Sequence, residues 1–379
     1  MHEGLKSHTA FYYAFAAVLT LVMIIIFWCI FRKLKQKRTE RRRRRNFEDN
    51  GGNLLVQKLT AKPLLEDPNR FKLFSLEEIN RATKNFSPEF LLGHGRGRVY
   101  KGKLEDGRMV AIKKVIVSDR SRVPQFITEV DILLRVSYIG VVSLIGCCMD
   151  KKHPVVIYDY IEDGRTLFDL IISKDVSEIP WTLRFGIIFD VAHALNYLHF
   201  ESPEPVLHRD LSSSNVLINN EDRAILGDFG IAHLLTNDES HVTSVVRRGT
   251  IYTDPAVIFT NRYERASDVY SFGAIIVEIL IGKVETENLV DILIPKNLDD
   301  KEELEFTAIA HLARECLDPV PTERPTMREI VFKLKKIQGS RRTTSGIASS
   351  SVVYHDASEY EEESPLISNR GGLLRQQIT

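Results

Sequence analysis

Cysteine is scarce in this 379-residue sequence, and its few copies are not spaced as a structural site requires. No two of them form a Cys-x-x-Cys pair, which excludes a zinc ribbon and argues against a disulfide scaffold. The four cysteines are Cys29, Cys147, Cys148 and Cys316. Because Cys147 and Cys148 are adjacent, we expect reduced, buried thiols in a reducing compartment.

A net charge is also missing, since 51 Lys and Arg balance 51 Asp and Glu. The composition, 44% hydrophobic and 27% charged, excludes a wholly disordered chain, a collagen and a low-complexity fibre. The balance is nevertheless uneven along the chain. Residues 1–45 hold 11 basic and two acidic side chains, whereas residues 46–379 hold 40 basic and 49 acidic ones. A nucleic-acid-binding protein carries its basic patch on the folded domain, so we expect no nucleic-acid partner.

One long uncharged run, Phe11 to Phe31, contains 21 residues. As a helix it spans about 31 Å, close to the roughly 30 Å hydrocarbon core of a bilayer. Ten Lys and Arg follow within residues 32–45 and indicate the cytoplasmic side. We therefore expect a single transmembrane helix at 11–31, a short extracellular N-terminus at 1–10, and contact of the basic run with anionic lipid. A cleaved signal peptide carries its basic residues ahead of a shorter apolar stretch, unlike this one.

The rest of the chain changes character along its length. Residues 32–75 form a basic juxtamembrane segment and linker. Short runs with β-branched and aromatic residues, such as Met109–Ile112 and Val155–Tyr158, then predict strands, and stripes of helical spacing follow. A strand-rich part followed by a helix-rich part predicts two unequal lobes in one α+β unit at 76–338. Residues 339–379, rich in Ser, Thr and Glu, predict a disordered cytoplasmic tail.

Five short motifs occur in one order along this α+β unit. They are Gly93-His94-Gly95-Arg96-Gly97, then Val110-Ala111-Ile112-Lys113, then Glu129, then His208-Arg209-Asp210 with Asn215, and finally Asp228-Phe229-Gly230. Each motif alone is weak, because a glycine-rich loop is usually only a hairpin turn. Together and in this order they resemble the motif set of eukaryotic protein kinases. The resemblance covers about residues 76–338 and implies a bilobal kinase fold that uses ATP and Mg²⁺.

The resemblance also implies catalytic roles for particular side chains. Phosphoryl transfer requires mainly positioning and charge neutralisation. Lys113 would hold the α- and β-phosphates and would itself be held by Glu129. Asp228 and Asn215 would bind Mg²⁺ through oxygen ligands. Asp210 would orient the substrate hydroxyl and accept its proton.

The nucleotide would lie against the strand-rich lobe. Its phosphates would meet backbone N–H groups of the glycine loop, and the adenine would lie between apolar side chains and a hydrogen-bonding hinge. The nucleotide-binding residues implied in this way are Gly93, Gly95, Gly97, Val99, Ala111, Lys113, Asp159, Tyr160, Ile161 and Leu217.

Five further segments look like those of plant wall-associated receptor-like kinases. They are Asn50-Gly51-Gly52-Asn53-Leu54-Leu55, Phe74-Ser75 through Asn85-Phe86-Ser87, Gly146-Cys147-Cys148, Ser267-Asp268-Val269-Tyr270-Ser271-Phe272-Gly273 and Glu323-Arg324-Pro325-Thr326-Met327. This resemblance implies a cytoplasmic serine/threonine kinase domain behind a plasma-membrane helix. The Arg209 that precedes Asp210 resembles that of kinases activated by phosphorylation of the activation segment. Candidate phosphorylation sites in that segment are Thr243, Ser244 and Thr250.

The sequence departs from the family pattern around the catalytic centre. The glycine loop is one residue shorter than G-x-G-x-x-G, which predicts a changed turn and register. Ser212 occupies the place of a lysine that neutralises the γ-phosphate. The segment ending at Ala256 lacks a glutamate that pairs with an arginine at the position of Arg324. We expect this arginine to lose its partner and the loop to be destabilised, unless Glu323 or water substitutes.

These features support three interpretations of function. The first is a plasma-membrane-anchored serine/threonine kinase that transfers the ATP γ-phosphate to a cytoplasmic protein substrate. The second is a pseudokinase, a nucleotide-binding scaffold or decoy for an active partner kinase or immune receptor, and the third is a truncated gene product without function of its own. Besides the motif departures, the short region at 284–301 supports the second and third interpretations. Since ten extracellular residues cannot form a ligand-binding fold, we expect a co-receptor as partner.

Overall fold

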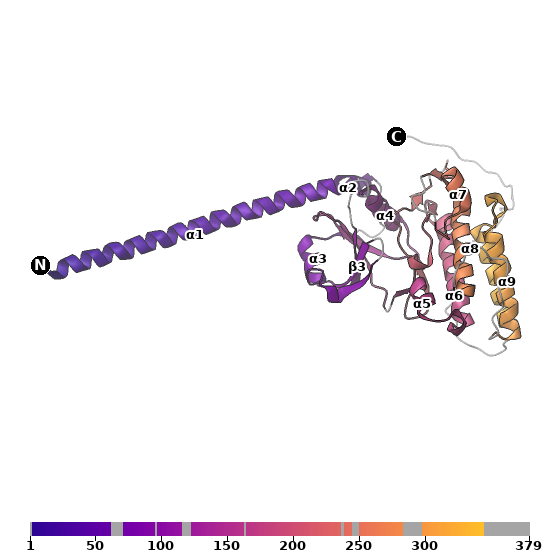
Figure 1. Cartoon of the computed structure of the whole chain (residues 1–379). Coiled ribbons are helices and arrows are strands. Elements are labelled where there is room, and N and C mark those ends of the chain that lie inside the picture. Colours follow the sequence, from indigo (N-terminus) through magenta and orange to yellow (C-terminus); the bar gives the residue numbers. More distant parts are fainter. Residues whose placement is uncertain are drawn as a thin grey trace, which may run out of the picture. The chain divides into compact units, whose positions relative to one another are not determined.

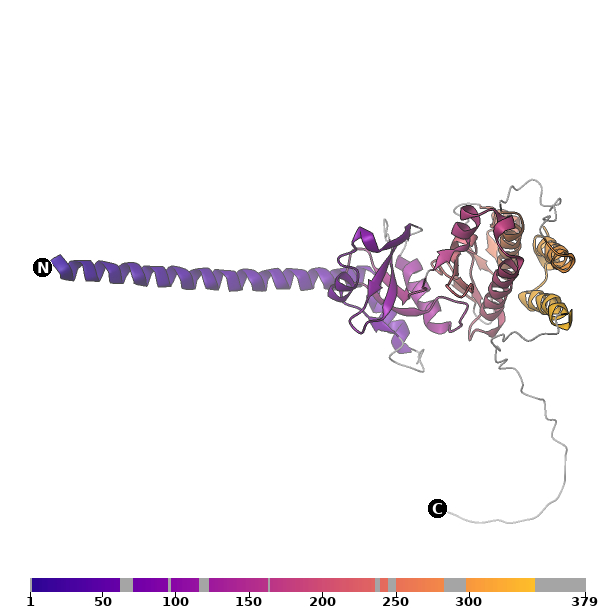
Figure 2. The same cartoon turned by 90° about the horizontal axis from the view of Figure 1, so that it is seen from below.

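The computed structural model describes residues 2–61, 71–94, 97–115, 123–162, 164–235, 239–244, 250–282 and 298–344 (Figures 1 and 2). Gly95 of the predicted glycine loop, most of the region 284–301 and the predicted tail beyond residue 344 lie outside these residues. The chain divides into two compact units, Met1–Ile337 and Gln338–Thr379. The sheet, the predicted site residues and the core described below belong to the first unit.

Three helices lie in the part of the chain that precedes the large sheet or flanks its first strand. They are α1 (His2–Asp49), α2 (Gly52–Ala61) and α3 (Leu76–Ala82). Ser75 caps the start of α3, because Ser75 Oγ accepts from Glu78 N and Glu78 Oε2 accepts from Ser75 N. Hydrogen bonds from Lys72 and from the Ser75 backbone lower the pKa of Glu78 to about 2.

The predicted transmembrane segment, residues 11–31, lies within α1. Across the part of the chain that the structure describes, however, no helix is both long enough and apolar enough to cross a membrane.

A six-stranded sheet forms the first lobe, as the β-branched runs predict. Its strands are β1 (Lys72–Leu73), β2 (Leu91–His94), β3 (Gly97–Lys103), β4 (Met109–Val115), β5 (Leu144–Cys148) and β6 (Val155–Asp159), in the spatial order β1-β5-β6-β4-β3-β2. All neighbouring pairs are antiparallel except β1 and β5. Helix α4 (Val123–Arg135) lies between β4 and β5 in the chain and carries a proline in its first turn, where the missing N–H costs nothing.

The second lobe is mostly helical, as the apolar stripes predict (Figure 1). Its helices are α5 (Leu167–Ser173), α6 (Trp181–Asn196), α7 (Pro255–Thr260), α8 (Arg265–Ile281), α9 (Asp300–Cys316) and α10 (Met327–Thr344), the last continuing into the second unit. Its short strands are β7 (Arg165–Thr166), β8 (Val206–Leu207), β9 (Val216–Ile218), β10 (Ala224–Leu226), β11 (His233–Leu234), β12 (Val242–Thr243) and β13 (Arg262–Tyr263). The strand-rich part followed by a helix-rich part confirms the predicted α+β class.

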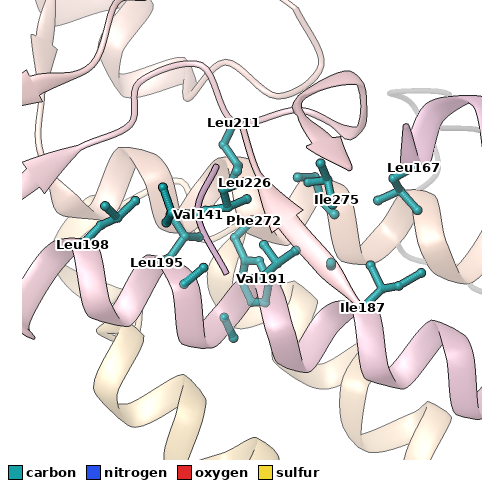
Figure 3. Packing of buried hydrophobic residues seen from close by; sticks show 14 of the residues in the cluster. Val141, Leu167, Ile187, Val191, Leu195, Leu198, Leu211, Leu226, Phe272 and Ile275 are labelled. Carbon is teal, nitrogen blue, oxygen red and sulfur yellow. The ribbon is translucent and has the colours of Figure 1, made fainter. Parts of the chain in front are cut away.

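The core of the helical lobe lies between α6 and α8 (Figure 3). Ile187, Val191 and Leu195 recur on one face of α6 at helical spacing and are fully buried with Phe272 and Ile275 of α8. This packing fixes α8, whose Asp268 accepts hydrogen bonds from the backbone of the segment that begins at His208. A smaller buried cluster, including Ile79, Ile112 and Ile157, lies between α3 and the sheet.

The adjacent cysteines are free and buried in β5, as predicted. Burial raises the pKa of both thiols, that of Cys148 to about 11. Both side chains are therefore neutral at physiological pH and act as small apolar core residues.

Candidate functional site

Three charged side chains from different elements meet where the two lobes face each other. Lys113 of β4 places its Nζ 2.9 Å from Glu129 Oε1 of α4 and 2.8 Å from Asp228 Oδ1. The three side chains are 13%, 3% and 17% exposed. The structure thus brings together the lysine, the helix glutamate and the metal-site aspartate that the motifs predict.

The Lys113 ammonium is held in its charged form. Burial alone would lower its pKa, but the negative charges of Glu129 and Asp228 outweigh this effect and raise the pKa above its usual value. Lys113 therefore carries a positive charge at physiological pH. A cation fixed in this place suits the neutralisation of phosphate oxygens.

A further group holds Glu129, and the sequence reasoning missed it. The hydroxyl of Tyr158, near the end of β6, donates a hydrogen bond to Glu129 Oε1. Burial and the nearby Glu129 charge raise the pKa of Tyr158 well above its ordinary value, so the phenol stays a donor. In the sequence, only the position of Tyr158 directly before the predicted hinge pointed to this role. In the structure it lies opposite Ala111 in the neighbouring strand.

The loop from His208 to Asn215 brings two predicted site residues, Asp210 and Asn215, together. Asn215 Nδ2 donates to the backbone oxygen of Asp210 at 2.7 Å and to its Oδ2 at 3.2 Å. Because the nitrogen of this amide faces Asp210, the amide oxygen is the atom that would ligate a metal. With the Asp228 carboxylate it offers the hard oxygen donors that Mg²⁺ prefers, so these residues fit the predicted ion.

A buried carboxylate from α8 fixes the start of this loop. Asp268 accepts the backbone N–H groups of His208 and Arg209, both at 2.8 Å, and lies 2.9 Å from His199 Nε2. Burial opposes ionisation, yet the hydrogen bond and charge of His199 keep the pKa of Asp268 below its ordinary value. Asp268 matched a family motif in the sequence, but its supporting contacts join positions too distant to be read from spacing.

Phe229 aims Asp228 toward Lys113. The Phe229 ring is fully buried and packs against the His208 ring, with 4.9 Å between centroids. His208 Nε2 in turn lies 3.1 Å from the backbone oxygen of Gly227. Asp228 has a positive φ of 58°, a conformation that costs energy for a residue with a side chain. Packing of the neighbouring ring therefore maintains a strained backbone that presents this carboxylate to the site.

The predicted nucleotide-binding residues of the sheet lie on three neighbouring strands. Val99 of β3 is opposite Lys113 of β4, and Ala111 of β4 is opposite Tyr158 of β6. Since cross-strand partners share a face, Val99, Ala111 and Lys113 line the same side of the sheet. Val99 and Ala111 are half-buried, as is Leu217 of β9, a further predicted nucleotide-binding residue.

The shortened glycine loop still joins paired strands. Gly93 of β2 is opposite Val99 of β3, and a β-bulge between Leu91 and Gly93 shifts the register. Gly97 begins β3. The predicted hinge residues, Asp159, Tyr160 and Ile161, follow at the end of β6 and line a cavity with the 136–143 loop.

The substrate side of the site is a cavity of about 370 Å³. Asp210, Ser212, Asn215 and Asp228 line it. Its described lining residues include one cation, Arg209, and no lysine, so none of them replaces the charge that Ser212 lacks. The Arg209 guanidinium instead lies over the Tyr263 ring, 4.5 Å from its centroid, and burial lowers its pKa.

Two of the predicted phosphorylation sites lie in or next to a small strand pair. Thr243 of β12 is opposite Arg262 of β13, and Ser244 N donates to Asn261 O at 2.9 Å. The neighbouring pair joins Val242 to Tyr263, the residue that Arg209 covers. The third site, Thr250, donates its N–H to Thr253 Oγ1 at 2.9 Å.

The expectation that Arg324 loses its partner is wrong. Arg324 makes a bidentate pair with Asp254, at 2.7 Å from Nη1 to Oδ2 and 2.9 Å from Nη2 to Oδ1. Both side chains are almost fully buried. Asp254 also accepts from Ala256 N at 2.9 Å as the N-cap of α7. The Asp-Pro pair at the start of this helix could have revealed the substitute partner in the sequence, because it places an acidic N-cap two residues before the position of the missing glutamate.

A second network joins the same segment to the catalytic loop. The Tyr252 hydroxyl lies 2.7 Å from Glu278 Oε2, and Ser213 Oγ lies 3.0 Å from Glu278 Oε1. The two hydroxyl oxygens are 2.9 Å apart. Burial raises the pKa of Glu278, while both hydrogen bonds counteract this effect. These three residues, none of them predicted, hold the substrate-side segment against the loop that carries Asp210.

Comparison with known proteins is consistent with this geometry. The family model described as protein tyrosine and serine/threonine kinase matches residues 89–334. Wall-associated receptor kinase-like 1 of Arabidopsis thaliana is 34% identical over 337 residues, which cover 83% of this chain and 46% of that protein. Wall-associated receptor kinase-like 17 of the same plant is 36% identical over 291 residues, 70% of this chain and 37% of that protein. The chain therefore spans less than half the length of the curated relatives it matches.

Proposed function

The chain belongs to the protein tyrosine and serine/threonine kinase family, and from this premise we propose that it transfers the ATP γ-phosphate to serine or threonine hydroxyls. The observation that carries the proposal is the contact of Lys113 with both Glu129 and Asp228. This arrangement is the one that phosphoryl transfer needs, because positioning and charge neutralisation supply most of the catalysis.

Each residue of the site would have a defined task. Lys113 would neutralise the α- and β-phosphates, held in place by Glu129. Asp228 and the Asn215 amide oxygen would hold Mg²⁺, which supplies further charge neutralisation at the phosphates. Asp210 would orient the substrate hydroxyl and accept its proton as the oxygen bonds to the γ-phosphorus and ADP leaves.

We place this activity at the plasma membrane. The relatives are named receptor kinase-like, which supports a receptor-like protein with its kinase domain in the cytoplasm. The uncharged run at 11–31 and the basic residues that follow support an anchor with anionic-lipid contact. A protein substrate or partner kinase, and a co-receptor, would then be the cellular partners.

The test is autophosphorylation of the purified full chain with Mg²⁺ and γ-labelled ATP. We expect label on serine and threonine in the wild-type protein, and none in Lys113→Met or Asp210→Asn. Phosphoamino-acid analysis checks the hydroxyl specificity. Label on tyrosine alone would contradict the serine/threonine proposal, and equal label in all three proteins would show a contaminating kinase.

A pseudokinase that binds nucleotide as a scaffold or decoy for an active kinase or immune receptor is the second candidate. Ser212 favours it, because no described lysine in the cavity supplies the missing charge. Under this candidate the wild-type protein shows a thermal shift with nucleotide but incorporates no label. The same preparation therefore separates the two functions.

A further inference from the structure

The segment that precedes the kinase domain folds onto the helix that carries Glu129. Helix α1 ends at Asp49 and α2 begins at Gly52, and Gly51 between them has a φ of +78°, which glycine adopts without strain. We call residues 46–58 the elbow. A side chain at Gly51 would come within 3.2 Å of Val123 and 3.3 Å of Ile127, so the elbow passes directly over the first turns of α4.

One side of the elbow binds a turn of the sheet. The buried Asn50 uses its Nδ2 to donate to the backbone oxygens of Met149 at 2.8 Å and Lys151 at 2.6 Å. Asn46 Nδ2 donates to the oxygen of Asp150 between them, also at 2.8 Å. Three consecutive carbonyls of the turn between β5 and β6 thus have partners in the elbow. Loss of these donors would leave the carbonyl of Met149 buried without that partner, which is costly, so the contact favours an amide side chain at position 50.

The other side of the elbow binds α4. Leu55 is fully buried in the same core cluster as Ile127 of α4. Lys58 pairs with Asp131, whose side chain is only 4% exposed and which also pairs with Arg135. Figure 1 shows α2 beside α4, and the two helices are in contact. The elbow therefore links α4 to the sheet.

These contacts lie on both sides of Glu129 in the sequence. Ile127 precedes Glu129 by two residues and packs beside Gly51, while Asp131 follows it by two residues and binds Lys58. Residues two positions apart lie about 200° around a helix, so the elbow contacts the face of α4 opposite Glu129. A rotation or outward shift of α4 that withdraws Glu129 from Lys113 would therefore disturb the elbow contacts. The ion pair at the site and the elbow contacts therefore favour the same position of the helix.

We propose that the elbow is a positioning element of the kinase site: Asn50, Leu55 and Lys58 hold α4 so that Glu129 meets Lys113. Its consequence for catalysis rests on the proposed kinase function. Only those molecules in which Lys113 is paired to Glu129 bind ATP productively. If loss of the elbow contacts lowers the fraction of such molecules by a given factor, the apparent KM for ATP rises by the same factor. At saturating ATP the kcat changes much less, because the nucleotide selects the competent state.

The test compares Asn50→Asp with Asn53→Asp in the full chain. Both substitutions add one negative charge, but Asn53 is exposed, whereas a carboxylate at position 50 faces two carbonyl oxygens. We expect Asn50→Asp to raise the KM for ATP about tenfold or more with kcat within about threefold, and to speed amide exchange in residues 123–135 about tenfold. Asn53→Asp stays within about twofold of the wild-type protein in both measurements.

Two further comparisons distinguish a loss of positioning from a folding defect. Leu55→Ala should reproduce the KM effect and Leu54→Ala should not, since Leu54 is 48% exposed on the same helix. Lys58→Ala should raise the KM for ATP. Lys58→Arg should leave it at the wild-type value, because an arginine preserves the positive charge opposite Asp131. The proposal is overturned if Asn50→Asp matches the wild-type protein, or if it lowers kcat and the Tm of the whole domain at unchanged KM.

Two readouts do not depend on catalysis. If the wild-type chain transfers no phosphate, the proposed function fails, but the Kd for a fluorescent ATP analogue and the exchange of α4 still test the elbow. A weaker Kd and faster α4 exchange in Asn50→Asp than in Asn53→Asp support the positioning role in that case. Unchanged exchange overturns it irrespective of activity.

Discussion

The two sides of the catalytic cleft differ in how far they keep the groups that phosphoryl transfer needs. On the nucleotide side, Lys113, Glu129 and Asp228 form one buried ionic cluster. On the substrate side, Ser212 supplies no charge, and the segment from Thr250 to Ala256 lacks its usual glutamate. The charged groups of the nucleotide side are therefore complete, although its glycine loop is one residue short, whereas the substrate side has lost a charge.

On the altered side, the carboxylate that pairs with Arg324 has a substitute, whereas the positive charge missing at Ser212 has none among the described cavity residues. Asp254 takes over the pairing with Arg324, because a helix cap two residues earlier can reach the same guanidinium. No described cavity residue does the same for Ser212. A pair that only stabilises the fold tolerates a shifted partner, whereas phosphate neutralisation needs a cation at one position.

The largest expected effect comes from breaking the complete side. Asp228→Asn removes a carboxylate that contacts Lys113 and would hold Mg²⁺, so we expect kcat/KM to fall about a thousandfold. Asp222→Asn removes the same charge from an exposed turn and should change little. Initial rates over a range of Mg²⁺ concentrations measure both. A loss of less than tenfold in Asp228→Asn would argue against the metal-binding role.

Next is the structural pair on the altered side. Asp254→Ala leaves the fully buried Arg324 guanidinium without a carboxylate, so the free energy of unfolding should fall by about 3–5 kcal/mol. Glu323→Ala, at an exposed neighbouring position, should cost less than about 0.5 kcal/mol. Urea unfolding of the two variants compares them. Equal losses in the two variants would contradict the assignment of Asp254 as the main partner of Arg324.

A positive charge restored at position 212 should make the substrate side more like a typical kinase site. Ser212→Lys places a positive charge in the substrate-side cavity, and we expect kcat to rise about tenfold to a hundredfold. Ser214→Lys, at an exposed position, tests whether an added positive charge alone is sufficient, and should give no comparable rise in kcat. Single-turnover transfer at saturating ATP measures the step. An unchanged rate in Ser212→Lys would show that charge at this position does not limit transfer.

The smallest effect concerns the additional support of Glu129. Tyr158→Phe removes one hydrogen bond to a carboxylate that Lys113 still holds, so the KM for ATP should rise about fivefold, equivalent to about 1 kcal/mol. Tyr270→Phe, which removes a hydroxyl on α8, serves as the matched control. Steady-state kinetics with varied ATP separates them. A fall in kcat at constant KM would place Tyr158 in the chemical step instead.

The sequence predicts local features of this molecule better than its long-range contacts. Alternating strands, helical stripes and the motifs with Lys113, Glu129 and Asp228 could be read directly, because each depends on short spacing. The Asp254–Arg324 pair and the elbow contacts of Asn50 join residues 70 and about 100 positions apart. Such contacts depend on how the elements pack, and a single sequence records no trace of them. In the sequence, Asn50 belongs to a family-like run within a stretch that is predicted to be a linker.

The most direct test of the complete nucleotide side combines binding and transfer in one preparation. The Kd for a non-hydrolysable ATP analogue with Mg²⁺ and the transfer of labelled γ-phosphate would be measured for the full wild-type chain and for Asp210→Asn. We predict a similar Kd, within about threefold, for both proteins, and transfer only in the wild-type chain. Wild-type transfer no faster than that of Asp210→Asn, or absence of nucleotide binding in both, would contradict the account.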